Sequence, residues 1–357
     1  MLFCVTFRRF AVKRLALLLA LTLLAPSAFA RDSFKVAWSI YVGWMPWGYA
    51  ADHGIVKKWA DKYGIDIEVV QINDYIESIN QYTAGAFDAC VMTNMDGLTI
   101  PAAGGVDSTA LIVGDFSNGN DGVVLKGKKN LKSIAGQKVN LVELSVSHYL
   151  LARGLDSVGL KESDLTVVNT SDADMVAAYA TPDVTAVVTW NPLLSEILSM
   201  PDSHKVFDSS QIPGEIIDLL VINTETLAAN PKLGKALTGA WYETMALMSG
   251  KDKAGIAART AMGEASGTDL AGYEAQLAST KMFYQAKDAV AFTNSAALKT
   301  TMKAVAEFSF DHGLLGEGAP DAGFIGVETP SGIYGNADNV KLRFDPAYMQ
   351  MAADGKL

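Results

Sequence analysis

Residues 138–189 read KVNLVELSVSHYLLARGLDSVGLKESDLTVVNTSDADMVAAYATPDVTAVVT, and this stretch decides the fold class. Short apolar runs rich in Val, Leu and Thr alternate in it with segments whose apolar residues recur at helical spacing. The predicted elements are, in order, strand Lys138–Val142, helix Ser147–Val158, strand Leu165–Val168, helix Ala173–Ala180 and strand Thr185–Thr189. Strands that alternate with helices are typical of parallel sheets covered by helices, so the class is α/β.

The same alternation precedes this stretch. The predicted elements there are strand Phe34–Ser39, a helix through residues 48–51 that ends at Gly54, strand Asp66–Gln71, helix Tyr75–Thr83 and strand Phe87–Met92. After residue 214 helical patterns dominate, as in Ala236–Met248, Leu270–Ser279 and Lys303–Phe310. Two series of strands and helices therefore predict two sheets with flanking helices.

Two turn-rich segments separate the series. The first is GDFSNGNDG at Gly114–Gly122, and the second lies between His204 and Gly214. We expect the chain to cross between lobes at both, which gives a bilobed protein with a hinge of two crossings and a cleft where a small ligand binds. The predicted parts are residues 31–115 (first part of lobe 1), 116–210 (lobe 2) and 211–357 (the return to lobe 1, mostly helical).

The first 30 residues have the three parts of a secretory signal peptide. Four basic residues come first, Leu15–Ala25 is apolar, and Ala-Phe-Ala at 28–30 suits cleavage before Arg31. The apolar run is too short to span a bilayer of roughly 30 Å as a helix. Cys4 is not placed as a lipoprotein cysteine would be. We therefore expect export of a soluble protein without a lipid anchor.

Composition excludes several classes of function. The formal net charge is −10, and removal of the basic signal would leave −14, which argues against nucleic acid or an anionic membrane as a partner. The chain has no HExxH, Cys-x-x-Cys, P-loop or GxGxxG motif, and its four histidines are scattered, so we expect no metal and no cofactor. Cys90 reads as a buried core residue, with a catalytic thiol as the alternative.

Three stretches resemble the periplasmic binding proteins of the nitrate, sulfonate, taurine and thiamine-precursor ABC importers. They are YVGWMPWGYAADHG (41–54), TAGAFDACVMTN (83–94) and VELSVSHYLLARGLDSVGL (142–160). The sequence looks most similar to the binding proteins of urea carboxylase systems, whose implied ligand is guanidine or a urea-like compound. The resemblance implies a type II periplasmic binding protein that hands a small molecule to an ABC permease in the inner membrane. We expect a periplasmic monomer without enzymatic activity.

Ligand contacts in this fold come from loops at the carboxyl ends of strands. Five such places follow the predicted strands or the second crossing, namely 41–47, 94–96, 143–147, 190–191 and 215–218. They are rich in tryptophan and carboxylates and contain no Arg or Lys. The candidate ligand-binding residues are Trp44, Trp47, Asn94, Asp96, Glu143, Ser145, Trp190 and Asp218. Aromatic faces with carboxylates suit a small planar cation such as guanidinium, and also urea.

Structural roles remain open for most of these residues. Trp44 and Trp47 could pack in a core, Trp190 could pin a turn, and Asp96 could cap a helix near Gly97. Glu143 could complement a helix dipole, while Asp218 stands in an apolar run and needs a partner if buried.

Three other functions also remain open. A sulfonate or nitrate could bind backbone donors at residues 145–147. An enzyme similar to thiamine-pyrimidine synthases, or a sensory binding protein, are the further alternatives.

Overall fold

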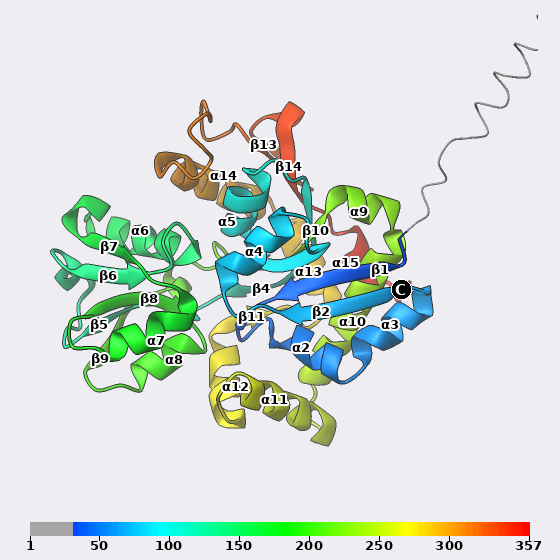
Figure 1. Cartoon of the computed structure of the whole chain (residues 1–357), viewed down its shortest axis with the longest axis horizontal. Coiled ribbons are helices and arrows are strands. Elements are labelled where there is room, and N and C mark those ends of the chain that lie inside the picture. Colours follow the sequence, from blue (N-terminus) through cyan, green and yellow to red (C-terminus); the bar gives the residue numbers. More distant parts are fainter. Residues whose placement is uncertain (1–30) are drawn as a thin grey trace, which may run out of the picture. The chain divides into compact units, whose positions relative to one another are not determined.

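The structure, a computed structural model, describes residues 31–357 and is a mixed α/β fold with two sheets (Figure 1). The predicted signal peptide lies outside the described residues. Within residues 31–357 no helix combines the length and apolar character needed to cross a bilayer.

The larger sheet has nine strands in the order β13-β12-β14-β4-β10-β3-β1-β2, with β11 paired to β4. Its strands are β1 (Ser33–Trp38), β2 (Asp66–Gln71), β3 (Ala89–Thr93), β4 (Ser108–Ser117), β10 (Ile217–Asn223), β11 (Thr280–Met282), β12 (Gly326–Thr329), β13 (Gly332–Tyr334) and β14 (Val340–Phe344). β1 pairs in parallel with β2 and β3, whereas β10 runs antiparallel to both β3 and β4.

The smaller sheet has five strands in the order β7-β6-β8-β5-β9. They are β5 (Asp121–Lys126), β6 (Lys138–Leu141), β7 (Thr166–Asn169), β8 (Ala186–Trp190) and β9 (Ser203–Asp208). β6 is parallel to β7 and β8, but β5 is antiparallel to β8 and β9. The expected parallel pairing is found between β1 and both β2 and β3, and between β6 and both β7 and β8, whereas β5 and β10, which follow the two passages between the sheets, pair antiparallel with their neighbours.

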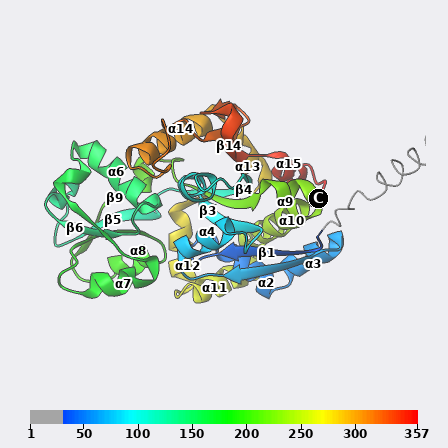
Figure 2. The same cartoon turned by 45° about the horizontal axis from the view of Figure 1, so that its top comes forward.

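Helices flank both sheets (Figures 1 and 2). Those of the smaller sheet are α6 (Val146–Val158), α7 (Asp172–Ala180) and α8 (Leu193–Leu198). Those of the larger sheet are α2 (Met45–Asp52), α3 (Ile55–Tyr63), α4 (Tyr75–Thr83), α5 (Asn94–Gly97), α9 (Thr224–Ala229), α10 (Pro231–Met248), α11 (Lys253–Ala265), α12 (Leu270–Ala278), α13 (Ala286–Thr293), α14 (Ala296–Asp311) and α15 (Ala347–Ala353). α3 was not predicted, since it follows Gly54, which we expected to end the helical segment.

The segment Gly114–Gly122 is not a loop, contrary to the expectation from its turn formers. β4 continues to Ser117 and β5 starts at Asp121, so three residues connect the two sheets. Pairing of β4 with β10 and β11 outweighs the turn propensity of this segment because it satisfies the backbone N–H and C=O groups. The chain returns from β9 to β10 between Asp208 and Ile217.

The core lies on the central strands of the larger sheet. All five residues of β3 are buried, and the first six of β10 are buried as well. Cys90 on β3 has no exposed surface, as its apolar surroundings predicted, and burial raises its pKa to about 12. The thiol is therefore protonated and unreactive at neutral pH. The carboxyl end of β3 and the amino end of β10 lie at the same edge of the sheet, where the candidate site is found.

Candidate ligand-binding site

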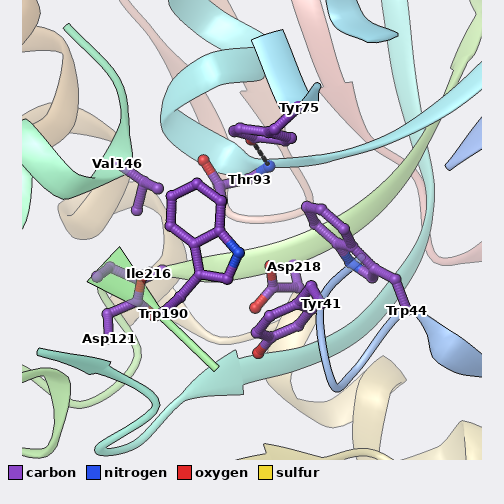
Figure 3. A pocket seen from close by; sticks show the side chains of 9 residues that line it. All are labelled: Tyr41, Trp44, Tyr75, Thr93, Asp121, Val146, Trp190, Ile216 and Asp218. Atoms are coloured by element: carbon purple, nitrogen blue, oxygen red, sulfur yellow. Dashed lines mark hydrogen bonds between the residues drawn. The ribbon is translucent and has the colours of Figure 1, made fainter. Parts of the chain in front are cut away.

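A cavity lies where the two sheets meet, and side chains from both line it (Figure 3). Its room for a water-sized sphere is about 10 Å³, which is about the space of a single water molecule. The lining residues are Tyr41, Trp44, Tyr75, Thr93, Asp121, Val146, Trp190, Ile216 and Asp218. The cavity is therefore almost closed in this structure, and a ligand larger than water requires its lining side chains to move apart.

Four aromatic rings form its walls. Tyr41 meets Trp44 edge to face with ring centroids 4.9 Å apart, and Trp44 meets Tyr75 at 5.6 Å. Tyr75 in turn meets Trp190, at the end of β8, edge to face at 5.7 Å. Trp44 Nε1 is buried and lacks a hydrogen-bond partner. Because each ring fixes its neighbour, the aromatic faces are held ready for a ligand.

A pair of carboxyl groups, Asp115 and Asp218, lies behind the Tyr41 ring. They are direct partners across the antiparallel pair of β4 and β10, and both are buried. Tyr41 donates a hydrogen bond to Asp115 Oδ1 (2.9 Å), while Oδ2 of Asp115 and Oδ2 of Asp218 receive no donor from other groups. Burial raises both pKa values, that of Asp115 to about 7, and repulsion from Asp115 raises that of Asp218 further. One proton shared by the two carboxyls explains this arrangement.

Asp121 supplies a third carboxyl, at the start of β5. Ser117 donates a hydrogen bond to its Oδ2, and burial raises its pKa to about 7. Asp121 pairs with Trp190 across β5 and β8, so the smaller sheet contributes one carboxyl and one ring side by side.

Asp96 does not line the cavity but lies behind its wall. Its Oδ2 accepts hydrogen bonds from Tyr75 Oη (2.6 Å) and Thr93 Oγ1 (2.8 Å), which fixes the Tyr75 ring against the cavity. Burial raises its pKa to about 6, and these bonds, with the backbone N–H of Val146, act in the opposite direction.

No Lys or Arg is among the nine lining residues that the structure describes. The nearby Arg153 on α6 is held by Glu215 through Nε–Oε2 (2.8 Å) and Nη2–Oε1 (3.0 Å). Burial raises the pKa of Glu215, but its hydrogen bonds with Arg153 and Tyr149 outweigh this effect and lower the pKa. The guanidinium is thus neutralised by this carboxylate, and the cavity keeps an excess of carboxyl groups.

Three of the eight candidate residues line the cavity, namely Trp44, Trp190 and Asp218. Asn94 is buried behind it, where its Oδ1 accepts from the Ile217 N–H (3.0 Å). Trp47 stacks on Trp241 in the core at 5.2 Å. Asp96 does not cap a helix with its side chain, since Thr93 caps α5.

The other two candidates surround the start of α6. Ser145 is its N-cap and accepts from the Ser147 N–H (3.2 Å). Glu143 is exposed and only its backbone N–H is engaged, with Asn169 Oδ1 (3.0 Å). Neither side chain lines the cavity.

The sequence did not single out six of the lining residues, which are Tyr41, Tyr75, Thr93, Asp121, Val146 and Ile216. Tyr41, Val146 and Ile216 lie inside loops that were selected, and Thr93 lies beside one of them. Asp115 and Asp121 could have been selected from their position in the first crossing segment, because crossing segments border a cleft between lobes.

The sequence matches the model of the NMT1-like family over residues 37–262, more than half of the chain. This chain belongs to the NMT1-like family. Relatives that carry only the general name of binding protein, in Brucella abortus and Brucella melitensis, are 26% identical to this NMT1-like protein over 238 residues. These residues are 62% of this chain and 69% of each relative.

Solved structures share the fold of this NMT1-like protein. The alkanesulfonate-binding protein SsuA of Xanthomonas axonopodis pv. citri, bound to MOPS, is 17% identical with a TM-score of 0.66, over 81% of this chain and 96% of that one. The aliphatic sulphonate-binding SsuA of Escherichia coli is 18% identical with a TM-score of 0.65, over 80% and 94%. The nitrate-binding NrtA of Synechocystis PCC 6803 is 12% identical with a TM-score of 0.57, over 92% and 99%. The fold is therefore that of periplasmic binding proteins, as the resemblance implied.

Proposed function

We propose that this protein is the periplasmic substrate-binding component of an ABC importer and that it captures a small planar cation such as guanidinium. Membership of the NMT1-like family and the fold shared with importer components support the first part. The second part is carried by one observation: four aromatic rings and two carboxyls line the cavity, and none of its described lining residues is basic.

The energies favour a planar cation in such a cavity. Each ring face attracts a cation by about 0.5–2 kcal/mol, more when water is excluded. A hydrogen bond to a charged group contributes about 1.5–3 kcal/mol. Asp218 Oδ2 is buried and receives no donor from other groups, so an N–H of the ligand would take the place of the proton shared with Asp115. Urea offers the same N–H donors without the charge and would bind less tightly.

A sulfonate or nitrate anion is the second candidate, supported by the ligands named for SsuA and NrtA. Such an anion would need the backbone donors at the start of α6, whose first residue, Val146, borders the cavity. These donors are engaged within the protein. The Ser147 N–H is bonded to Ser145 Oγ, the His148 N–H to the Ser145 carbonyl, and the Val146 N–H acts on Asp96. We therefore favour the cation.

Binding would proceed by closure of two lobes around the ligand. Tyr41, Trp44 and Asp218 belong to the part built on the larger sheet, and Trp190 and Asp121 to the part built on the smaller one. We propose that these parts, with the crossings after Ser117 and Asp208, act as the lobes. A ligand that contacts both favours the closed state by this difference in affinity.

The pH dependence of binding distinguishes the two candidates. The pKa of Asp121 is raised to about 7, so a cation competes with a proton for this carboxylate. Affinity for guanidinium, measured by quenching of tryptophan fluorescence, should rise between pH 5.5 and 8. Affinity for taurine or nitrate would fall over the same range, and that result would favour the anion.

A further inference from the structure

A cluster of three metal-ligating side chains lies outside the cavity. It consists of His148 on α6, Glu162 on the short turn η3 (Glu162–Asp164), and His312 at the carboxyl end of α14. Glu162 Oε2 is 3.0 Å from His148 Nε2 and 2.9 Å from His312 Nε2. All three ligand atoms lie within 4.8 Å of one another. The sequence gave no sign of this cluster because the residues are far apart along the chain.

The hydrogen bonds of His312 leave one nitrogen free for a ligand. Its Nδ1 donates to the Phe308 carbonyl (2.9 Å), so the lone pair of the neutral ring lies on Nε2, facing Glu162. A lone pair and a carboxylate oxygen that face each other at 2.9 Å need a cation between them, either a proton or a metal ion. The backbone carbonyl here plays the part that it commonly plays behind metal-bound histidines.

His148 provides the second observation. Its side chain is only 2% exposed, and its Nε2 lies close to Glu162 without a hydrogen bond of acceptable geometry. A ring nitrogen buried this deeply without a hydrogen-bond partner lowers the stability of the folded state unless a ligand binds it. Glu162 is 39% exposed and borders a groove between α6 and α14, so an ion could reach the cluster from solvent.

We propose that His148, Glu162 and His312 bind a divalent transition-metal ion of the Zn²⁺ class. Two imidazoles and one carboxylate are a donor set that zinc accepts, with a fourth position left for water from the groove. Ca²⁺ and Mg²⁺ prefer all-oxygen sites and do not fit two nitrogen ligands.

Metal binding changes one contact of His148. Its Nδ1 accepts the Leu144 N–H (3.1 Å), which places the proton of the neutral ring on Nε2. Ligation through Nε2 moves that proton to Nδ1, with no net release from this ring, and breaks the bond from Leu144. Leu144 is 43% exposed, so water can take over its N–H. Metal binding therefore comes with a small rearrangement of residues 143–145, and the proton that is released is the one held between His312 Nε2 and Glu162.

The position of the site gives the metal a structural consequence. His148 and Glu162 belong to the part built on the smaller sheet, whereas His312 follows α14 in the part built on the larger sheet. A bound ion would link these two parts at a point separate from the ligand cavity, because none of the three residues lines that cavity.

Titration of the purified, untagged protein with Zn²⁺ at pH 7.5 by calorimetry tests the site. We expect one ion per chain and release of protons, detected as a dependence of the measured enthalpy on the buffer. His312→Ala and Glu162→Gln should each weaken binding at least ten-fold, whereas His53→Ala, which removes an exposed histidine elsewhere, should not change it.

Co²⁺ absorption in the visible range gives an independent measure of nitrogen ligation in the same variants. Glu162→Gln keeps the size of a partly exposed side chain, so it should fold even if His312→Ala does not. Absence of Zn²⁺ binding by the wild type overturns the proposal. Binding that Glu162→Gln leaves unchanged overturns it equally.

Discussion

Replacing Asp218 with Asn should weaken ligand binding and stabilise the ligand-free protein at once. Asn has nearly the same shape and can donate its amide N–H to Asp115, its partner across β4 and β10. What is lost is one carboxyl group whose Oδ2 receives no donor from other groups, and which the ligand would contact in place of the proton shared with Asp115. A hydrogen bond to a charged group is worth about 1.5–3 kcal/mol, and each 1.4 kcal/mol is a factor of ten. Affinity for guanidinium at pH 8 should therefore fall roughly 10- to 100-fold.

The stability change has the opposite sign. The pKa of Asp218 is raised well above its ordinary value, by burial first and then by repulsion from Asp115. At pH 8 the unfolded chain has an ionised Asp218, and the folded state opposes that ionisation, which lowers the free energy of unfolding. Asn carries no such penalty, so Asp218→Asn should unfold at a higher temperature than the wild type at pH 8. The difference should shrink towards pH 4.

Calorimetric titration with guanidinium chloride in the low millimolar range, at constant ionic strength, measures the affinity, and thermal unfolding without ligand measures the stability. Thr244→Val serves as the control, because it changes a buried side chain on α10 that does not line the cavity. If the Asp218→Asn protein binds guanidinium as tightly as the wild type does, Asp218 does not contact the ligand. A variant that is less stable at pH 8 would refute the account of the carboxyl pair.

Three further predictions concern the same region. The pKa values of Asp96 (about 6), Asp115 and Asp121 (both about 7) exceed the ordinary value of 3.8, so the folded state binds more protons than the unfolded chain. The free energy of unfolding of the ligand-free protein should therefore fall as pH rises from about 4 to 7, by about 4 kcal/mol for Asp121 alone. Denaturant unfolding measures this profile, and a flat profile would contradict the prediction. Trp190→Ala should reduce guanidinium affinity about ten-fold in calorimetric titration, because it removes a ring that lines the cavity. Trp47→Phe should lower the unfolding temperature and leave the affinity unchanged. Equal affinities in both variants would show that Trp190 does not contact the ligand. Gly43→Ala should also weaken binding about ten-fold, because its Cβ would lie 2.5 Å from Asp115 Oδ2 and displace the carboxyl pair; unchanged affinity would show that the wall adapts.

Local patterns in the sequence were sufficient to predict many of the elements. Asp66–Gln71 and Tyr75–Thr83 have the predicted bounds, because alternation and helical spacing describe how each element meets its own sheet. The expectation that Gly114–Gly122 forms a loop was wrong, because the conformation of this segment depends on pairing with β10 and β11, which come much later in the chain.

The site was less predictable than the fold for a related reason. Trp44 and Trp47 are three residues apart in one short segment, yet one faces the cavity and the other stacks on Trp241 from α10. Tyr75 fits a helical core face equally well and is in fact a wall of the cavity. Only the relative placement of the two sheets decides these cases, and a local pattern carries no information about it.

Thermal unfolding of the purified protein with guanidinium, urea, choline, taurine and nitrate, at pH 8 and well below denaturing concentrations, decides whether the ligand is a cation or an anion. A ligand at 100 times its dissociation constant stabilises the folded state by about 2.7 kcal/mol. We expect a rise in unfolding temperature with guanidinium that exceeds the rise with urea, and none with taurine or nitrate. A rise in unfolding temperature with taurine or nitrate, and none with guanidinium, would contradict this expectation.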